Sequence, residues 1–191
     1  MLVQLVNRYP GLRKRIVAPF VVDVNPNIVS TVALVCAVFS GYFFFSGMFL
    51  LAAFFLFLNG FLDIVDGEIA KSGKWKQTKR GDFIDHTFDR VSDVFIFVGI
   101  AYNPLMPRNV VFLTLVCLIL VSYLGTQAQA LTKERFYGGI AGRSDRHVVL
   151  FFGAVAECFV GGALLYSVYL IFALSFVTFL QRFRSIYKML E

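Results

Sequence analysis

Four aspartates are spaced so that helices would place them in two same-face pairs. Asp63 and Asp66 lie three residues apart, and Asp85 and Asp89 lie four residues apart; helical side chains at these spacings are neighbours. If the two segments pack side by side, the four carboxylates converge, and the usual way to offset their repulsion is a hard divalent cation with oxygen ligands. We therefore predict a metal site, with Mg²⁺ as the expected ion, Mn²⁺ as the alternative, and two ions bound.

Glycines and a lysine beside these acids indicate a ligand that carries phosphate. Gly67 follows Asp66, and Gly81 opens the second segment; a missing side chain lets a phosphate or a ribose approach the backbone. Lys71 lies four residues beyond Gly67 and could neutralise phosphate charge. The alternative is a juxtamembrane salt-bridge network between the acids and basic residues such as Lys71 and Arg90, with no metal.

The elements that carry these residues are expected to be membrane helices. The chain has 191 residues, of which 58% are hydrophobic and 23 are Phe, and its mean hydropathy is +0.74. Such values exceed those of ordinary soluble domains. Apolar stretches, most of them near the length of about 20 residues that a spanning helix needs, recur at residues 28–45, 49–69, 88–102, 110–130, 148–160 and 163–179.

We therefore expect one all-α integral membrane domain over residues 1–191, with a bundle of six transmembrane helices over about residues 28–182. A juxtamembrane helix is expected to precede it over residues 1–20. Apolar residues recur there at near-helical spacing between Arg8 and the basic run 13–15. This pattern is typical of an amphipathic helix that lies at the membrane interface.

The basic residues predict the orientation in the membrane. With six spans and the N-terminus inside, all but Arg90 and Arg108 of the 18 basic residues fall in cytoplasmic segments, as the positive-inside rule requires. We expect a multi-pass protein of the cell membrane, with both termini and the acidic site facing the cytoplasm. The net charge of +6 is divided among four segments, so it does not form a nucleic-acid surface.

The residues around the acids match a known signature. They resemble that of the CDP-alcohol phosphatidyltransferase family, D-x-x-D-G-x-x-A-R, a spacer, then G-x-x-x-D-x-x-x-D. The matching positions are Asp63, Asp66, Gly67, Ala70, Gly81, Asp85 and Asp89. Lys71 stands where the family normally has Arg, which keeps the charge but loses the planar bidentate fork.

Two further elements extend the resemblance. Pro26, Asn27 and Ser30 are similar to the P-N-x-x-[ST] element that leads into the family's first transmembrane helix. Residues 139–146 are similar to the G-I-A-E-R-x-E-R element of members whose acceptor alcohol carries a phosphate, with Gly142 in place of the first Glu.

Arg143 and Arg146 of that element are the candidate acceptor-binding residues. They lie three residues apart at the expected start of a helix, so both could hold one anionic group. The alternative is that they are ordinary positive charges of a cytoplasmic loop.

The resemblance implies a reaction and a role for each residue. An acceptor hydroxyl would attack the β-phosphorus of a CDP-linked lipid, CDP-diacylglycerol or CDP-archaeol, and CMP would leave. Asp63, Asp66 and Asp85 would hold the metal, and Asp89, a further metal ligand, would be the general base. The implied nucleotide-binding set is Asp63, Asp66, Gly67, Ala70, Lys71, Thr78 and Gly81. The resemblance also implies a homodimer.

Several alternatives stay open on the sequence alone. The expected acceptor is inositol phosphate, ahead of glycerol phosphate, because of the arginine pair; serine or unphosphorylated inositol would not need that pair. A different class, a cation transporter with an intramembrane acidic path, predicts acids near the bilayer centre and internal repeats. A purely structural membrane protein leaves Gly67 and Gly81 unexplained.

Overall fold

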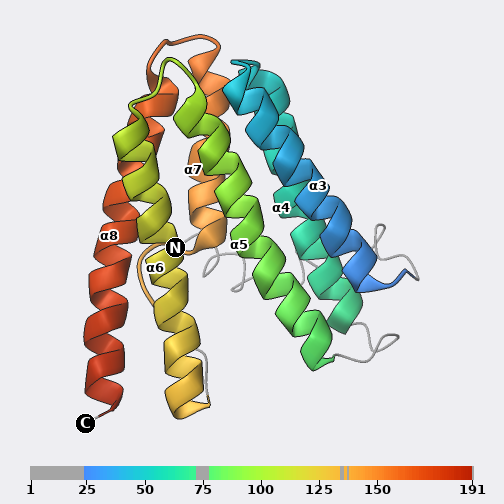
Figure 1. Ribbon diagram of the computed structural model, residues 1–191, viewed down its shortest axis with the longest axis vertical. Coiled ribbons are helices and arrows are strands. Elements are labelled where there is room, and N and C mark those ends of the chain that lie inside the picture. The colour runs from blue at the N-terminus through green and yellow to red at the C-terminus, as the bar shows by residue number, and fades with distance from the viewer. Residues whose placement is uncertain (1–23, 72–77, 134–135, 137, 191) are drawn as a thin grey trace.

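The protein is an α-helical bundle (Figure 1). The computed structural model describes residues 24–71, 78–133, 136 and 138–190. Within these residues the chain forms α3 (Pro26–Phe45), α4 (Phe49–Lys71), α5 (Lys79–Tyr102), α6 (Arg108–Thr132), α7 (Arg143–Glu157) and α8 (Ala163–Met189). The juxtamembrane helix expected over residues 1–20 lies outside the described residues.

The expectation of six transmembrane helices is wrong. Among the described helices only α3, α4, α6 and α8, four in all, are long and apolar enough to cross a membrane. α7 has 15 residues and is too short. α5 has 24 residues, but Asp85, Asp89, Arg90 and Asp93 fall in every 18-residue window of it, which is more charge than a candidate span carries. The charged groups that make the site are thus what remove α5 from the set of spans.

Two groups of helices form the bundle. α3 packs against α4 and α5 on one side, and α6 packs against α8 on the other (Figure 1). The short α7 joins the groups because it contacts both α4 and α8, and α5 also contacts α6. The starts of α3 and α5 and the ends of α4, α6 and α8 lie together at what we call the lower end, as drawn in Figure 1.

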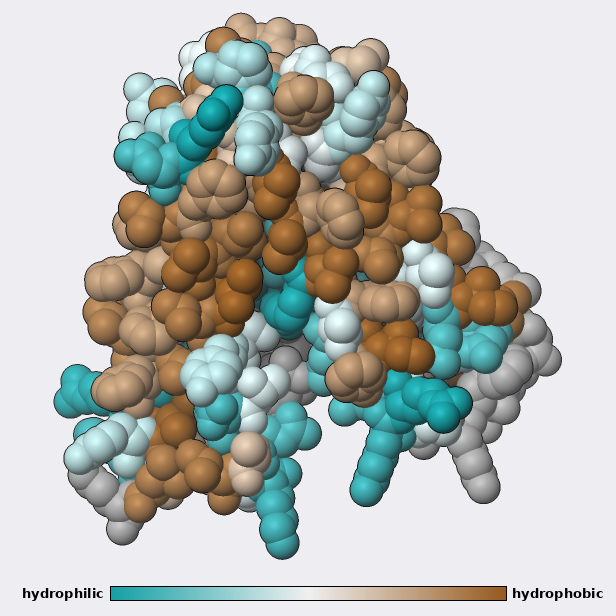
Figure 2. Space-filling model, viewed as in Figure 1, coloured by the Kyte–Doolittle hydropathy of each residue, from teal (hydrophilic) through white to brown (hydrophobic). Residues whose placement is uncertain are grey.

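The surface has the polarity of a membrane protein. Apolar side chains cover the middle of the molecule, whereas hydrophilic side chains gather toward its upper and lower ends (Figure 2). Large apolar side chains such as Phe57, Leu113 and Phe176 are exposed, which is expected where lipid surrounds the protein. The lower end is hollowed between the two helix groups, and hydrophilic side chains lie at the top of this hollow (Figure 2).

α3 and α5 are in backbone contact through two glycines. A Cβ at Gly99 would lie 2.0 Å from the Gly41 carbonyl oxygen, and a Cβ at Gly41 would lie 2.3 Å from the Phe95 carbonyl oxygen. Neither position has room for a side chain, and small residues are what allow helices to approach this closely in membranes. The contact fixes α5, and therefore Asp85 and Asp89, against α3.

Replacing Gly99 with Ala is therefore expected to destabilise the protein. Overpacking typically costs about 1–3 kcal/mol, and here the clash is with a backbone oxygen that a rotamer change cannot move. Thermal unfolding of the purified protein in detergent measures the effect. Gly161→Ala is the matched control, because a Cβ there meets nothing within 4 Å. An equal melting temperature for the two variants would contradict the packing argument.

Candidate active site

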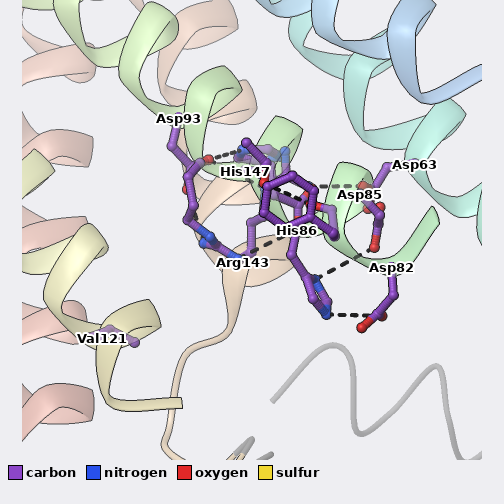
Figure 3. Close-up of polar contacts among 12 residues, drawn as sticks. Asp63, Asp82, Asp85, His86, Asp93, Val121, Arg143 and His147 are labelled. Carbon is purple, nitrogen blue, oxygen red and sulfur yellow. Dashed lines mark hydrogen bonds and ion pairs between the residues drawn. The ribbon is translucent and has the colours of Figure 1, made fainter. Parts of the chain in front are cut away.

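Three aspartates from two helices form an acid cluster. α4 contributes Asp63 and Asp66, α5 contributes Asp85, and one carboxylate oxygen of each lies within 4.8 Å of the others. Asp66 is buried, and the other two are half-buried. Figure 3 shows Asp63 and Asp85 side by side. Three of the four carboxylates predicted to converge thus lie together, without Asp89. A donor set made only of carboxylate oxygens fits Mg²⁺ or Mn²⁺.

The start of α3 supports this cluster. The Ser30 hydroxyl donates a hydrogen bond to Asp66 Oδ2 at 2.7 Å, so the serine of the P-N-x-x-[ST] element orients a predicted metal ligand. Pro26 stands at the first helical position of α3, where its fixed φ favours helix initiation. A Cβ at Gly81 would lie 3.4 Å from Asn27 Oδ1, so the starts of α3 and α5 lie against each other.

The predicted nucleotide-binding residues lie at the same end of the bundle. Gly67 and Ala70 are half-buried on the last turns of α4. Thr78 caps α5, and its hydroxyl accepts a hydrogen bond from the Gly81 amide at 3.0 Å. The side chain of Lys71 lies outside the described part of the structure. These positions thus border the lower side of the acid cluster.

Arg143 lies among the acids. Its Nη1 donates to Asp63 Oδ1 at 3.0 Å and also to Asp89 Oδ1, and its Nε donates to Asp93 Oδ1 at 3.3 Å. The sequence placed Arg143 with the acceptor; the structure adds direct contacts with predicted metal ligands. The start of α7 is thereby joined to α4 and α5 through one guanidinium.

Asp93 and His147 are site residues that the sequence analysis missed. His147 Nε2 lies 3.3 Å from Asp93 Oδ1, and Arg90 Nη1 lies 3.5 Å from Asp93 Oδ2. Burial alone would raise the pKa of Asp93, but the His147 hydrogen bond and the Arg143 charge hold it well below its usual range. A fully ionised, buried carboxylate thus anchors the first turns of α7 (Figure 3).

Asp89 is placed to hold a proton. Burial raises its pKa to about 8; the Arg143 charge opposes this rise, and the Asp63 charge adds to it. A bound divalent cation would lower that pKa again, because a nearby positive charge favours the carboxylate. A carboxylate whose pKa is raised toward neutral pH is suited to act as a general base. Arg90, named in the salt-bridge alternative, lies 3.6 Å from Asp89.

Arg146 is a buried cation at the start of α7. Its side chain belongs to a residue that is only 5% exposed, and its Nη1 has no hydrogen-bond partner within the described ranges. Burial lowers its pKa to about 10; Asp93 opposes this shift, whereas the charges of Arg90, Arg143 and Arg182 contribute to it. A buried, incompletely bonded guanidinium is costly. An anionic ligand would remove this cost.

Glu157, a lone acid of the expected span 148–160, has a structural role. Its two carboxylate oxygens accept hydrogen bonds from the Gly162 amide at 3.0 Å and the Leu164 amide at 2.7 Å. It thereby caps the start of α8 at the end of the bundle opposite the acid cluster (Figure 1).

An α-helical membrane protein with a carboxylate cluster toward one end of its bundle is the class that the fold and site define. The chain belongs to the CDP-alcohol phosphatidyltransferase family, whose model matches residues 23–180. The resemblance seen in the aspartate signature is confirmed. The protein is therefore a transferase of phospholipid biosynthesis, and the transporter and purely structural interpretations are set aside.

Individual relatives agree with this assignment. The chain is 34% identical over 168 residues to the archaetidylinositol phosphate synthase of Pyrococcus horikoshii, covering 88% of this chain and 86% of the relative. The phosphatidylinositol phosphate synthase of Mycobacterium tuberculosis with CDP-DAG bound has a TM-score of 0.79 at 25% identity, covering 91% of this chain and 94% of that one. The same enzyme in complex with manganese and citrate has a TM-score of 0.78 at 24% identity, over 92% and 88% of the two chains, and shows the shared fold.

Proposed function

We propose that this enzyme joins the phosphatidyl-type group of a CDP-linked lipid to inositol phosphate and releases CMP. The observation that carries the choice of acceptor is Arg146, a buried guanidinium whose Nη1 has no hydrogen-bond partner among the described residues. It lies one helical turn beyond Arg143, which touches the acid cluster. A phosphate on the acceptor would supply the missing anion. The names of the relatives, both inositol phosphate lipid synthases, support the same acceptor.

Asp63, Asp66 and Asp85 would hold Mg²⁺ or Mn²⁺, with two ions expected and Asp89 as a further ligand. When bound, the metal would act as a Lewis acid toward the diphosphate and offset the negative charge that develops on the departing CMP. The close approach of three carboxylates supports this assignment, since it concentrates negative charge that a divalent cation would offset.

Asp89 would act as the general base. It takes the proton of the acceptor hydroxyl while that oxygen forms a bond to the β-phosphorus of the CDP-linked lipid. The bond between this phosphorus and the bridging oxygen breaks, and both electrons leave with CMP. The donor is CDP-diacylglycerol or CDP-archaeol, whose tails would lie along the apolar helices.

The nucleotide would lie at the lower end of the bundle, against Gly67, Ala70, Lys71, Thr78 and Gly81. The positions of Gly67 and Gly81 beside the acid cluster support this placement, because neither presents a side chain to a diphosphate. We regard residues 1–191 as one domain that carries both substrates, and we expect a homodimer on the strength of the family resemblance.

The lower end of the bundle would face the cytoplasm, together with both termini. The basic residues Lys79, Lys133 and Arg184 stand at the ends of helices that meet there, as expected of a cytoplasmic surface. Arg108 begins α6 at the opposite end, where its guanidinium lies 5.2 Å from the centre of the Tyr102 ring.

CMP release by the purified enzyme tests this proposal. The enzyme is supplied with a CDP-linked lipid and Mg²⁺, and offered inositol phosphate, glycerol phosphate, serine or inositol in separate reactions. We expect release with inositol phosphate and little with the unphosphorylated alcohols. Release with glycerol phosphate alone would keep the anion site but change the acceptor, and release only with serine or inositol would overturn the role of Arg146.

A further inference from the structure

Residues 138–142, the segment that leads into α7, are held by side chains on one face of α8. Arg182 Nε donates to the Gly138 carbonyl oxygen at 2.7 Å, the Ile140 amide donates to Gln181 Oε1 at 3.0 Å, and the Ala141 amide donates to Thr178 Oγ1 at 3.2 Å. On α8, Gln181 and Arg182 follow Thr178 by three and four residues, so the three side chains share a face. Three of the backbone polar groups of this segment thus bond to side chains of a single helix.

The segment also lies in direct contact with α8. Gly139 has a φ of +121°, and a Cβ at this position would lie 2.4 Å from Thr178 Cγ2. Only glycine adopts such a backbone conformation readily, and only glycine leaves room for the Thr178 methyl group. Gly139 therefore allows residues 139–142 to pack directly against α8 just before α7 begins.

This contact sets where the basic residues of α7 begin. Gly142 is the N-cap of α7, and its amide donates to Asp145 Oδ2 at 2.9 Å. Arg143 and Arg146 follow within the first turn. A displacement of residues 138–142 would therefore move both guanidinium groups relative to Asp63 and Asp89.

The two contacts of the α7 start lie on different helix groups. Arg143 reaches the acids of α4 and α5, whereas Thr178 and Gln181 belong to α8, and Arg182 Nη1 also donates to the Val121 carbonyl oxygen of α6 at 2.8 Å. The α6–α8 group thus positions the start of α7, and the α3–α5 group carries the acid cluster.

We propose that Thr178 and Gln181 are positioning residues. They hold the start of α7, and therefore Arg143 and Arg146, at a fixed position relative to the acid cluster, and they thereby set the affinity for the acceptor. They touch neither the acids nor the two arginines through any contact found in the described residues. Their effect on catalysis is exerted through the backbone of residues 140–141. The proposal rests on the proposed function only in taking the α7 start as the acceptor site.

The test compares Thr178→Val and Gln181→Met with wild type. Losing one hydrogen bond to the backbone of residues 140–141 should raise KM for the acceptor about fivefold to tenfold. KM for the CDP-linked lipid should be unchanged, and kcat should stay within about twofold of the wild-type value. Thr178→Ser keeps the hydroxyl and should restore the wild-type KM. Thr114→Val is the matched control, because the Thr114 hydroxyl is buried and donates to the Val110 carbonyl oxygen within α6 at 2.8 Å.

A second readout does not depend on turnover. Amide hydrogen exchange of residues 138–146 should be faster in Thr178→Val and Gln181→Met than in wild type, and unchanged in Thr114→Val. Equal rises in both KM values, or no change in acceptor KM and exchange, would overturn the proposal. Which alcohol the wild-type enzyme accepts decides the proposed function separately, because the variants are compared with whichever acceptor the wild type uses.

Discussion

Asp89→Asn is expected to lower kcat about a thousandfold, the effect typical of losing a general base. The amide has nearly the same shape but cannot take the acceptor proton. Asp89 is a sound candidate because its carboxylate bonds Arg143 beside the acid cluster and burial raises its pKa to about 8. CMP release at saturating CDP-linked lipid and acceptor measures the loss.

Asp82→Asn is the control for this change. Asp82 lies on the same helix, but its side chain is 64% exposed and its contact is with His86 at 3.3 Å. Its replacement should leave kcat within about twofold, as expected of an exposed charge. A similar kcat for Asp89→Asn and Asp82→Asn would exclude Asp89 as the base.

A base also requires its deprotonated form, so wild-type kcat should fall as pH drops through the pKa of Asp89.

Arg146→Gln is expected to raise KM for the phosphorylated acceptor about 10- to 100-fold, the loss of one charge-assisted contact. Arg146 is 5% exposed, and its Nη1 lacks a hydrogen-bond partner within the described chain. The KM for the CDP-linked lipid should change little, since the predicted nucleotide-binding residues lie on α4 and at the start of α5. Initial rates measured at varied acceptor concentration give the value.

Arg184→Gln is the matched control, because Arg184 is exposed near the end of α8. It should leave both KM values unchanged. If Arg146→Gln and Arg184→Gln behave alike, Arg146 is only one of the positive charges that set the membrane orientation, and the acceptor needs no phosphate.

The acid cluster could be predicted because helix periodicity fixes it. Two pairs at spacings of three and four residues must each share a face. The packing of both α4 and α5 against α3 then brings Asp63, Asp66 and Asp85 together. The same helical spacing places the two residues that the sequence analysis missed on the same helix faces, since Asp93 follows Asp89 by four residues and His147 follows Arg143 by four. Their pairing across α5 and α7 depends on tertiary packing.

The number of membrane spans could not be predicted from apolar stretches alone. The apolar stretch 88–102 is only part of α5, which begins nine residues earlier, at Lys79, so that ten of its 24 residues are charged, His, Ser or Thr. α7 ends at Glu157, whose carboxylate accepts hydrogen bonds from the start of α8. Both departures arise where a charged side chain has a partner in another element.

Binding of Mn²⁺ to the purified protein, followed by the EPR signal of the free ion, tests the central claim that Asp63, Asp66 and Asp85 hold the metal. Each of the three Asp→Asn variants should weaken Mn²⁺ binding at least about tenfold, a loss that even residues which only orient a ligand can cause. Asp82→Asn should bind like wild type. Wild-type affinity in all three cluster variants would contradict the account.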